Sequence, residues 1–363
     1  MSGVNGQPPA VCGRVVVLAA TQHGLFLFHG DDERSSWERS GPFLPDFDVN
    51  HAAYDPRDGA IWAAANNGEA RVYRSPNFGQ SWDAMGSPFD AHSVWHVEPG
   101  RTERQGEVFV GVKPAALYRS ADGGDTWTAV DGLNNHESRP EWWEGGGGLC
   151  LHTIIIPPGC NGRIYAGISV AGLFRSDDDG ASWTPMNEGV VSFADQMPDP
   201  VVHRGVHRCV HKAVVHPTKP DVMFQQNHLG VYRSYDAGEN WTSINDGLPS
   251  NFGFPIAIGA GDQPSIFVIP ADGERLPIRT KGRLSVWRSD DDGESWFEAA
   301  EGLPKGEHNV LREAMATDDR TPTGVYLGSQ DGVLHASVDG GTSYRTIAAD
   351  LPAVRSIKIA YAV

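Results

Sequence analysis

Apolar residues along this chain occur in short runs that lead into one repeated polar phrase. Residues 117–120, 173–176 and 231–234 each run directly into Ser-x-Asp-x-Gly-x-x-Trp, and another short run begins at the Trp. Short runs bounded by Gly, Asp and Ser predict β-strands joined by tight turns. We therefore expect the phrase to be the hairpin between the last two strands of a unit. In it the Asp accepts N–H groups, the Gly adopts a positive φ and the Trp covers the turn.

The phrase recurs along the whole chain. Its anchor residues are Ser120, Asp122, Gly124 and Trp127; Ser176, Asp178, Gly180 and Trp183; Ser234, Asp236, Gly238 and Trp241; Ser289, Asp291, Gly293 and Trp296; and, relaxed, Ser75, Asn77, Gly79 and Trp82, then Ser337, Asp339, Gly341 and Tyr344. A worn first copy reads Gly30, Asp32, Arg34 and Trp37. Repeats of about 50 residues hold four short strands each. Seven of them predict an all-β, seven-bladed β-propeller that occupies residues 1–363 as one domain.

The first strand of each unit is expected to line the central axis. Candidate inner strands are residues 52–56, 94–99, 153–157 and 213–217, each ending at a Pro or directly before one. Residues 354–363 also read as a strand, but no phrase follows them. The first unit, in contrast, begins with what should be its second strand, at residues 15–20. We expect the C-terminal strand to complete blade 1, which closes the ring and removes its edges.

Composition narrows the possible partners. The formal charge of −17 argues against nucleic acid as a partner, and no basic block reverses this locally. Residues 1–13 are expected to be a flexible N-terminal segment, and no signal peptide or membrane span is apparent, so a cytoplasmic protein without a membrane partner is expected. Four cysteines without close-spaced pairs predict buried thiols. The sequence does not define the oligomeric state.

The repeated phrase resembles that of the Asp-box β-propellers, also called bacterial neuraminidase repeats, over almost the entire chain. The resemblance implies the propeller fold. It does not single out one activity, because sialidases, xyloglucan hydrolases, receptor domains and a photosystem II assembly factor share the repeat. In such propellers the phrase lies on the face away from the usual site, so the resemblance implies a site among the loops that precede the inner strands. The arginine pattern of a sialidase is missing near Arg14, which makes classical sialidase activity unlikely.

Histidines are frequent at those positions. His51 and His152 both lie five residues before the Pro that follows their strands, His211 lies six before its Pro, and His228 lies at a corner between second and third strands. Histidines four apart on one strand are separated by about 13 Å. A transition-metal site would therefore need one histidine from each of several blades. We predict His51, His152, His211 and His228 as the ligands of a divalent transition metal; the alternative is that they cap the inner strands by hydrogen bonding.

Two long loops flank the fourth repeat and supply the remaining candidates. Glu141 and Glu144 are the predicted catalytic carboxylates. Trp142 and Trp143 suit a flat sugar ring, although such a pair also serves as a loop anchor. The predicted substrate-binding residues are Trp142, Trp143, Arg139, Arg204, His23 and Arg312. A third excursion, residues 270–283, could bind an anionic group or be a solvated hairpin tip.

Together these features give two hypotheses. The first is a metal-dependent hydrolase or lyase that acts on a small polar or sugar-derived substrate at a histidine-lined axial pocket. The second is a non-catalytic propeller that binds a ligand or protein, as an assembly factor does.

Overall fold

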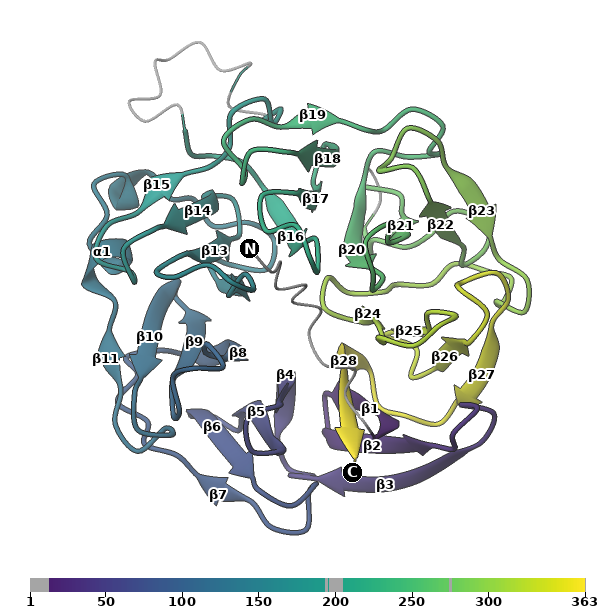
Figure 1. Ribbon diagram of the computed structural model, residues 1–363, viewed down its shortest axis with the longest axis horizontal. Coiled ribbons are helices and arrows are strands. Elements are labelled where there is room, and N and C mark those ends of the chain that lie inside the picture. The colour runs from purple at the N-terminus through teal and green to yellow at the C-terminus, as the bar shows by residue number, and fades with distance from the viewer. Residues whose placement is uncertain (1–12, 193–194, 196–204, 274–275, 363) are drawn as a thin grey trace, which may run out of the picture.

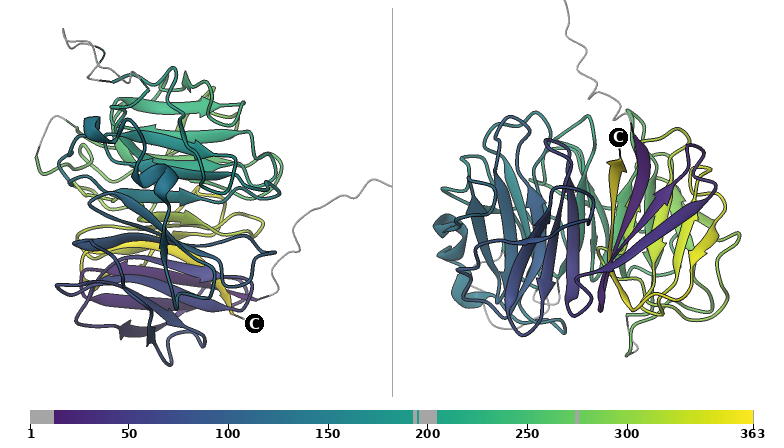
Figure 2. Two further views of the ribbon diagram at one scale, coloured as in Figure 1. Left: turned by 90° about the vertical axis from the view of Figure 1, so that its left-hand side faces the viewer. Right: turned by 90° about the horizontal axis from the view of Figure 1, so that it is seen from below.

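Seven four-stranded antiparallel sheets stand around a common axis as the blades of a propeller (Figures 1 and 2). The computed structural model describes residues 13–192, 195, 205–273 and 276–362. The predicted all-β, seven-bladed architecture is confirmed. Apart from Gly13, the predicted flexible N-terminal segment lies outside the described residues.

The strands follow one another from the axis outward in each blade. Blade 1 holds β1 (Arg14–Thr21), β2 (Gly24–Gly30) and β3 (Trp37–Phe43), with β28 (Val354–Ala362) innermost. Blade 2 holds β4 (Asp48–Asp55), β5 (Ala60–Asn66), β6 (Ala70–Ser75) and β7 (Asp83–Ala84), and blade 3 holds β8 (Ser93–Pro99), β9 (Val108–Lys113), β10 (Ala116–Ser120) and β11 (Thr128–Ala129). Blade 4 holds β12 (Leu151–Ile155), β13 (Ile164–Ile168), β14 (Gly172–Ser176) and β15 (Thr184–Pro185), and blade 5 holds β16 (Val210–Val215), β17 (Met223–Asn227), β18 (Gly230–Ser234) and β19 (Thr242–Ser243). Blade 6 holds β20 (Gly253–Ile258), β21 (Ile266–Pro270), β22 (Val286–Ser289) and β23 (Phe297–Ala299), and blade 7 holds β24 (Met315–Thr317), β25 (Val325–Gly328), β26 (Leu334–Ser337) and β27 (Arg345–Ala348). One helical turn, α1 (Asp131–Asn134), and a 3-10 turn, η1 (Arg139–Glu141), lie between blades 3 and 4.

The C-terminal strand closes the ring as predicted. β28 pairs antiparallel with β1 in a register that runs from Arg14 opposite Ala362 to Ala20 opposite Ser356. Blade 1 is therefore assembled from both ends of the described chain (Figure 1). This pairing supplies partners for the edge of β1, which would otherwise be an exposed strand edge at the axis.

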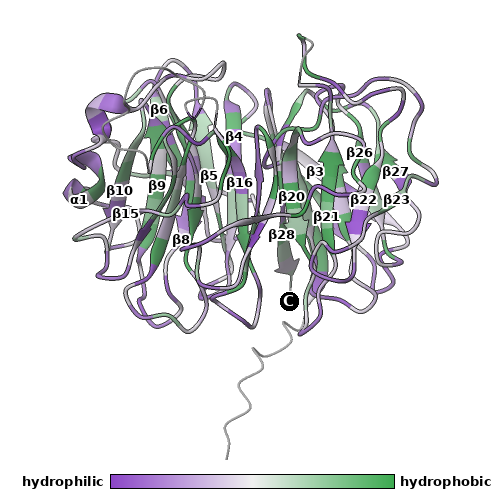
Figure 3. Cartoon of the chain, turned by 90° about the horizontal axis from the view of Figure 1, so that it is seen from above, coloured by the Kyte–Doolittle hydropathy of each residue, from purple (hydrophilic) through white to green (hydrophobic). Residues whose placement is uncertain are grey.

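Apolar side chains fill the spaces between neighbouring blades. Between blades 2 and 3, for example, Trp62 and Val72 pack with Val94 and Val108, and all four are buried. Hydrophobic residues accordingly lie along the strands and polar ones along the loops (Figure 3). In the described part of the chain, no helix is long and apolar enough to cross a membrane.

The repeated phrase forms the predicted hairpins. In blade 4 the Gly180 N–H donates to Ser176 Oγ at 2.8 Å, and the Ser176 hydroxyl donates to Asp178 Oδ1 at 2.8 Å. Asp178 also accepts the Ser182 N–H at 2.8 Å, and its hydrogen bonds with Ser182 hold the pKa of its carboxyl below the ordinary value. The Trp183 indole donates back to the Gly180 carbonyl at 3.1 Å. The acidic side chain is thus committed to the turn, which makes the phrase a folding element.

The worn first copy uses a different acid from the one that its spacing suggests. Asp31, not Asp32, accepts the Ser36 N–H at 3.0 Å and the Ser36 hydroxyl at 2.8 Å. Hydrogen bonds from Ser35 and Ser36 lower the pKa of Asp31 to about 2. Asp32 instead pairs with Arg14 at the surface. Ser35 lies four residues after Asp31, as Ser182 does after Asp178, so the frame of this copy is shifted by one residue toward the N-terminus.

Candidate functional site: the axial cavity

A cavity of about 810 Å³ opens at the end of the propeller where the inner strands begin. Its lining comes from the starts of the inner strands and from the corners between second and third strands, in all seven blades. The hairpins of the repeated phrase lie at the opposite ends of these strands. The predicted separation of the folding phrase from the candidate site is therefore confirmed in geometry.

β-Bulges near the starts of the inner strands bring side chains into this cavity. One extra residue interrupts the pairing of each of five strands, namely Asn50, Trp95, His152, His211 and Arg355. All five line the cavity. Bulges re-aim side chains in this way beside many active sites.

The bulges also correct the predicted register of the histidines. His152 and His211 occupy the extra position, whereas His51 lies one position later and pairs opposite Ala64. His51 is instead equivalent to His96, which pairs opposite Gly111. Counting back from the following Pro placed His51 and His152 in one register, but the stretch from the bulge to the Pro is one residue longer in blade 2, from Asn50 to Pro56, than in blade 4, from His152 to Pro157.

The four histidines predicted as ligands of one metal fall into separate places. Among the described residues, two groups have ligand atoms within 4.8 Å of one another: His51 with His96 and Glu313, and Cys209 with His211 and His228. His152 belongs to neither group. A single four-histidine site, as predicted from the sequence, is therefore not formed.

The first group is a buried charge network. Glu313 lies 3.3 Å from Lys212 Nζ and 3.1 Å from Lys358 Nζ, and the His51 ring stacks on His96 with 3.8 Å between centroids. Burial alone would raise the pKa of Glu313, but the two lysines hold it well below its ordinary value. Burial, helped by His96 and Lys358, keeps the pKa of His51 well below 6.5, so its ring is neutral. Two ammonium groups already neutralise the one carboxylate, which leaves a divalent cation no net attraction here.

The second group lies in blade 5 and faces the cavity. Cys209 Sγ is 3.7 Å from His211 Nε2, and the His228 ring stands edge-on to His211. His211 Nδ1 is 2.6 Å from the Gly253 carbonyl of the next blade, an acceptor that requires a proton on this nitrogen. Burial, together with Arg312, lowers the pKa of His211 to about 3, so that its ring is neutral at pH 7.

His152 lines the cavity and carries one buried nitrogen without a described partner. Its Nδ1 is 3.0 Å from Thr153 Oγ1, while Nε2 has no hydrogen-bond partner among the described residues. Burial and the nearby Arg312 hold the pKa of His152 well below its ordinary value. An orphaned buried nitrogen on a cavity wall costs free energy unless a ligand or water satisfies it.

Two arginines line the cavity, and only one of them is paired with a carboxylate. Arg355 donates to both oxygens of Asp48 at 3.0 and 2.9 Å. Arg312, predicted as a substrate-binding residue, forms no ion pair with a described carboxylate; it lies over the Trp95 ring and 3.9 Å from Cys150 Sγ. Arg312 is thus a cation of this cavity that can receive an anionic group, as is Lys113, whose ammonium group donates to the Gly147 carbonyl.

The predicted loop residues lie mainly outside the cavity. Trp142 is buried, its indole donates to Ser138 Oγ at 2.9 Å, and Arg139 lies over its ring. Trp142 therefore anchors the loop, which was the alternative to sugar binding. Glu144 and His23 are exposed and do not line the cavity. Arg204 lies outside the described residues.

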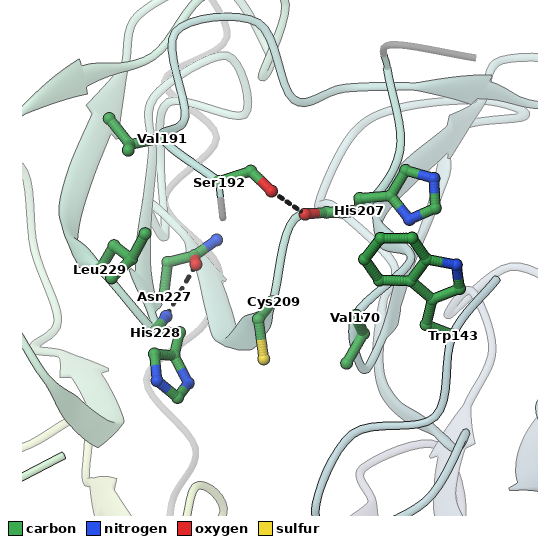
Figure 4. A pocket seen from close by; sticks show the side chains of 9 residues that line it. All are labelled: Trp143, Val170, Val191, Ser192, His207, Cys209, Asn227, His228 and Leu229. Atoms are coloured by element: carbon green, nitrogen blue, oxygen red, sulfur yellow. Dashed lines mark hydrogen bonds between the residues drawn. The ribbon is translucent and has the colours of Figure 1, made fainter. Parts of the chain in front are cut away.

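A smaller pocket of about 60 Å³ opens beside the cavity (Figure 4). Its lining includes Trp143, whose ring contacts His207 at 4.2 Å, and Glu141 in turn lies 3.6 Å from the His207 ring. Val170, Cys209 and His228 line both this pocket and the axial cavity. Trp143 and Glu141 therefore lie at the smaller pocket beside the axial cavity and not in the axial cavity itself.

The third excursion reaches over the cavity with apolar residues. Leu276 and Ile278 line the cavity, while Arg279 and Lys281 lie near Asp331 and Asp272. The anionic site considered for this loop is therefore occupied by the chain's own carboxylates, and Arg275 lies outside the described residues.

Several cavity residues were missed from the sequence, namely Asp48, Trp95, Cys209 and Phe254. Cys209 lies two residues before His211, and this spacing on an inner strand was a usable signal once the cavity end was known. Asp48 and Trp95 have no distinctive sequence context. The bulges that select them become visible only in the strand pairing.

No protein-family model matches the sequence. The oligoxyloglucan-reducing end-specific xyloglucanase of Emericella nidulans is 24% identical over 326 residues, which cover 78% of this chain and 38% of that enzyme. The chain thus spans less than half of this relative's length.

Solved structures show the same fold. An ancestral GH74 enzyme superimposes with a TM-score of 0.61 at 20% identity, over 79% of this chain and 36% of that chain. YCF48 bound to a D1 peptide superimposes with a TM-score of 0.56 at 13% identity, over 99% of this chain and the whole of that one. At these identities the likeness shows the shared propeller.

Proposed function

We propose that this protein is a hydrolase that acts on a small carbohydrate-derived substrate bearing an anionic group, bound in the axial cavity. The observation that carries the proposal is the composition of the cavity: Trp95, Phe252 and Phe254 line it together with Arg312, which lies over the Trp95 ring and has no described carboxylate partner. Aromatic faces suit sugar rings, and a guanidinium binds carboxylate or phosphate. The distant similarity to a xyloglucanase supports a carbohydrate substrate and hydrolysis.

The carboxylates of the cavity suit binding better than acid–base catalysis. Glycosidases commonly use two carboxyl groups, one of which has a raised pKa. Of the described cavity carboxylates, Asp48 is held by Arg355, and Glu313 is held ionised by Lys212 and Lys358. We therefore propose that His152 Nε2 accepts the proton of the attacking water; a divalent metal held by Cys209, His211 and His228 would lower the pKa of that water. Water oxygen would then replace the leaving oxygen on the substrate, and that oxygen would take up the proton.

The test is a hydrolysis screen that contains neutral xyloglucan oligosaccharides, uronate-containing oligosaccharides, and lactones and esters of sugar acids. Turnover of an anionic member is expected to fall by at least about 100-fold in His152→Gln. His335→Gln is the matched control, because His335 is equally buried but lies in β26 outside the cavity. Binding of these compounds without turnover of any would assign the protein to the non-catalytic alternative.

A further inference from the structure

The three potential ligands in blade 5 come from different parts of one structural unit. Cys209 precedes β16, His211 is the bulge residue of β16, and His228 follows β17. Their ligand atoms lie within 4.8 Å of one another. Zn–S and Zn–N bonds of about 2.3 and 2.0 Å in a tetrahedron separate the ligand atoms by about 3.3–3.6 Å. The Cys209–His211 separation of 3.7 Å is already close to that range, and the His228 ligand atom lies within 4.8 Å of both.

Neighbouring groups fix the central ligand. The Gly253 carbonyl accepts the Nδ1 proton of His211, which leaves the lone pair on Nε2 directed toward the cysteine side. Phe252 and Phe254 pack against the His211 ring at 5.2 and 4.9 Å. A hydrogen bond from the non-ligating nitrogen and a tight apolar wall are what metal-binding histidines have in most proteins.

The surroundings leave room for a further ligand. Cys209 and His228 border both the axial cavity and the smaller pocket, and in Figure 4 the Cys209 sulfur lies between the His228 ring and Val170. Three protein ligands with an open fourth position are typical of catalytic zinc, whereas structural zinc is enclosed by four. Burial raises the pKa of the Cys209 thiol, which Arg312 opposes only in part, so the free thiol is protonated and the thiolate would form on metal binding.

We propose that Cys209, His211 and His228 bind one zinc ion, with its fourth position open to the axial cavity. The Cys209 thiol releases its proton when the Sγ–Zn bond forms, so binding is accompanied by the release of about one proton. The inference rests on the proposed function only for the role of the ion, which is to supply the activated water. It assigns no metal to His51, His96 and Glu313.

Cobalt titration of the full chain, purified without a histidine tag and stripped with a chelator, tests this site. The expected result is one Co²⁺ per chain with the near-ultraviolet absorption of a thiolate–cobalt bond. Cys209→Ser should abolish that absorption, and Cys209→Ser and His228→Gln should each weaken binding by at least about 100-fold, because loss of a direct ligand costs no less than loss of an outer partner.

Two matched controls separate this site from its neighbours. Cys150→Ser removes a nearby buried thiol that bonds to Ser169, and His51→Gln removes a member of the other group. Both should keep the absorption and the stoichiometry. Thermal unfolding of the metal-free variants shows whether each is folded, and His228→Gln carries the test should Cys209→Ser not fold.

The outcomes distinguish the metal site from the proposed hydrolase. Unaltered cobalt absorption in Cys209→Ser, or the absence of binding by the unsubstituted chain, would overturn the metal site. Hydrolysis by the metal-free chain would also overturn its role and leave the cavity proposal standing. Bound metal with no turnover in the substrate screen would support the site and refute the hydrolase.

Discussion

Two histidine-containing groups lie on different sides of the same axis and contain similar residue types, yet their chemistry differs. In blades 2, 3 and 7, His51, His96 and Glu313 are buried with two lysines that neutralise the carboxylate. In blade 5, Cys209, His211 and His228 face open space, and one backbone carbonyl orients the central ring. Charge compensation, rather than the number of histidines, decides which group can receive a cation.

The largest effect should come from removing the carboxylate of the buried network. Glu313→Gln leaves Lys212 and Lys358 without their counter-charge, and we expect the free energy of unfolding to fall by about 3–5 kcal/mol. Urea unfolding at pH 7 measures this change. Glu239→Gln is the control, because Glu239 is more than half exposed in its pair with Arg175 and should cost less than about 1 kcal/mol. A loss below about 1 kcal/mol for Glu313→Gln would mean that the network is not what holds this side of the axis together.

The cavity arginine gives the next effect. Arg312→Gln should weaken binding of a uronic-acid disaccharide by about 10–100-fold, the equivalent of one charged hydrogen bond, and should leave a neutral disaccharide unaffected. Calorimetric titration of both sugars measures it. Arg279→Gln, in the loop between β21 and β22 of blade 6, is the matched charge control. Equal weakening for both sugars would show that Arg312 shapes the cavity without recognising charge.

His335, a buried histidine outside the cavity, shows what burial does to the pKa of a histidine, with a smaller contribution from His308. Burial lowers the pKa of His335 to about 4, below the value near 6.5 of an unfolded chain. Its contribution to stability is therefore complete above pH 6.5 and is lost as the pH falls toward 4, by about 2 kcal/mol at pH 5. Urea unfolding from pH 7 to pH 5 should show a smaller decline in His335→Gln than in the unsubstituted chain. Identical declines would show that the protonation of His335 does not contribute to the loss of stability at low pH.

The folding hairpins should respond least, and only in stability. Ser176→Ala removes the acceptor of the Gly180 N–H and the donor to Asp178, so we expect a loss of about 1 kcal/mol. Cobalt binding should not change, because this hairpin lies at the opposite end of the blade from the cavity. Thermal unfolding and cobalt titration of the same preparation measure both quantities. Weakened cobalt binding would contradict the separation of folding and binding ends.

The fold could be predicted because its signals are local. Each hairpin needs a Ser, an Asp and a Gly at fixed spacing, and six copies keep this spacing even where Asn77 replaces the acid. The first unit lacks its innermost strand, and the chain ends with an extra strand. The simplest arrangement was that the extra strand completes the first blade and closes the ring. Both inferences depend on hydrogen bonding that sequence spacing specifies directly.

The site could be predicted only in part, because it depends on which residue each bulge selects. Of the predicted site residues, His211, His228, His152 and Arg312 line the axial cavity, and their predicted roles stay predictions. A bulge inserts one residue without a distinctive composition, so His51 was placed in the wrong register and Trp95 was overlooked. The pairing of Glu313 with lysines of blades 5 and 1 joins residues more than 40 positions apart, which spacing cannot reveal.

The most direct test is X-ray diffraction from crystals of the zinc-loaded protein, recorded on both sides of the zinc absorption edge. The account predicts one anomalous difference peak, within bonding distance of Cys209 Sγ, His211 Nε2 and the His228 ring. A peak between His51, His96 and Glu313, or no peak near the axis, would contradict it.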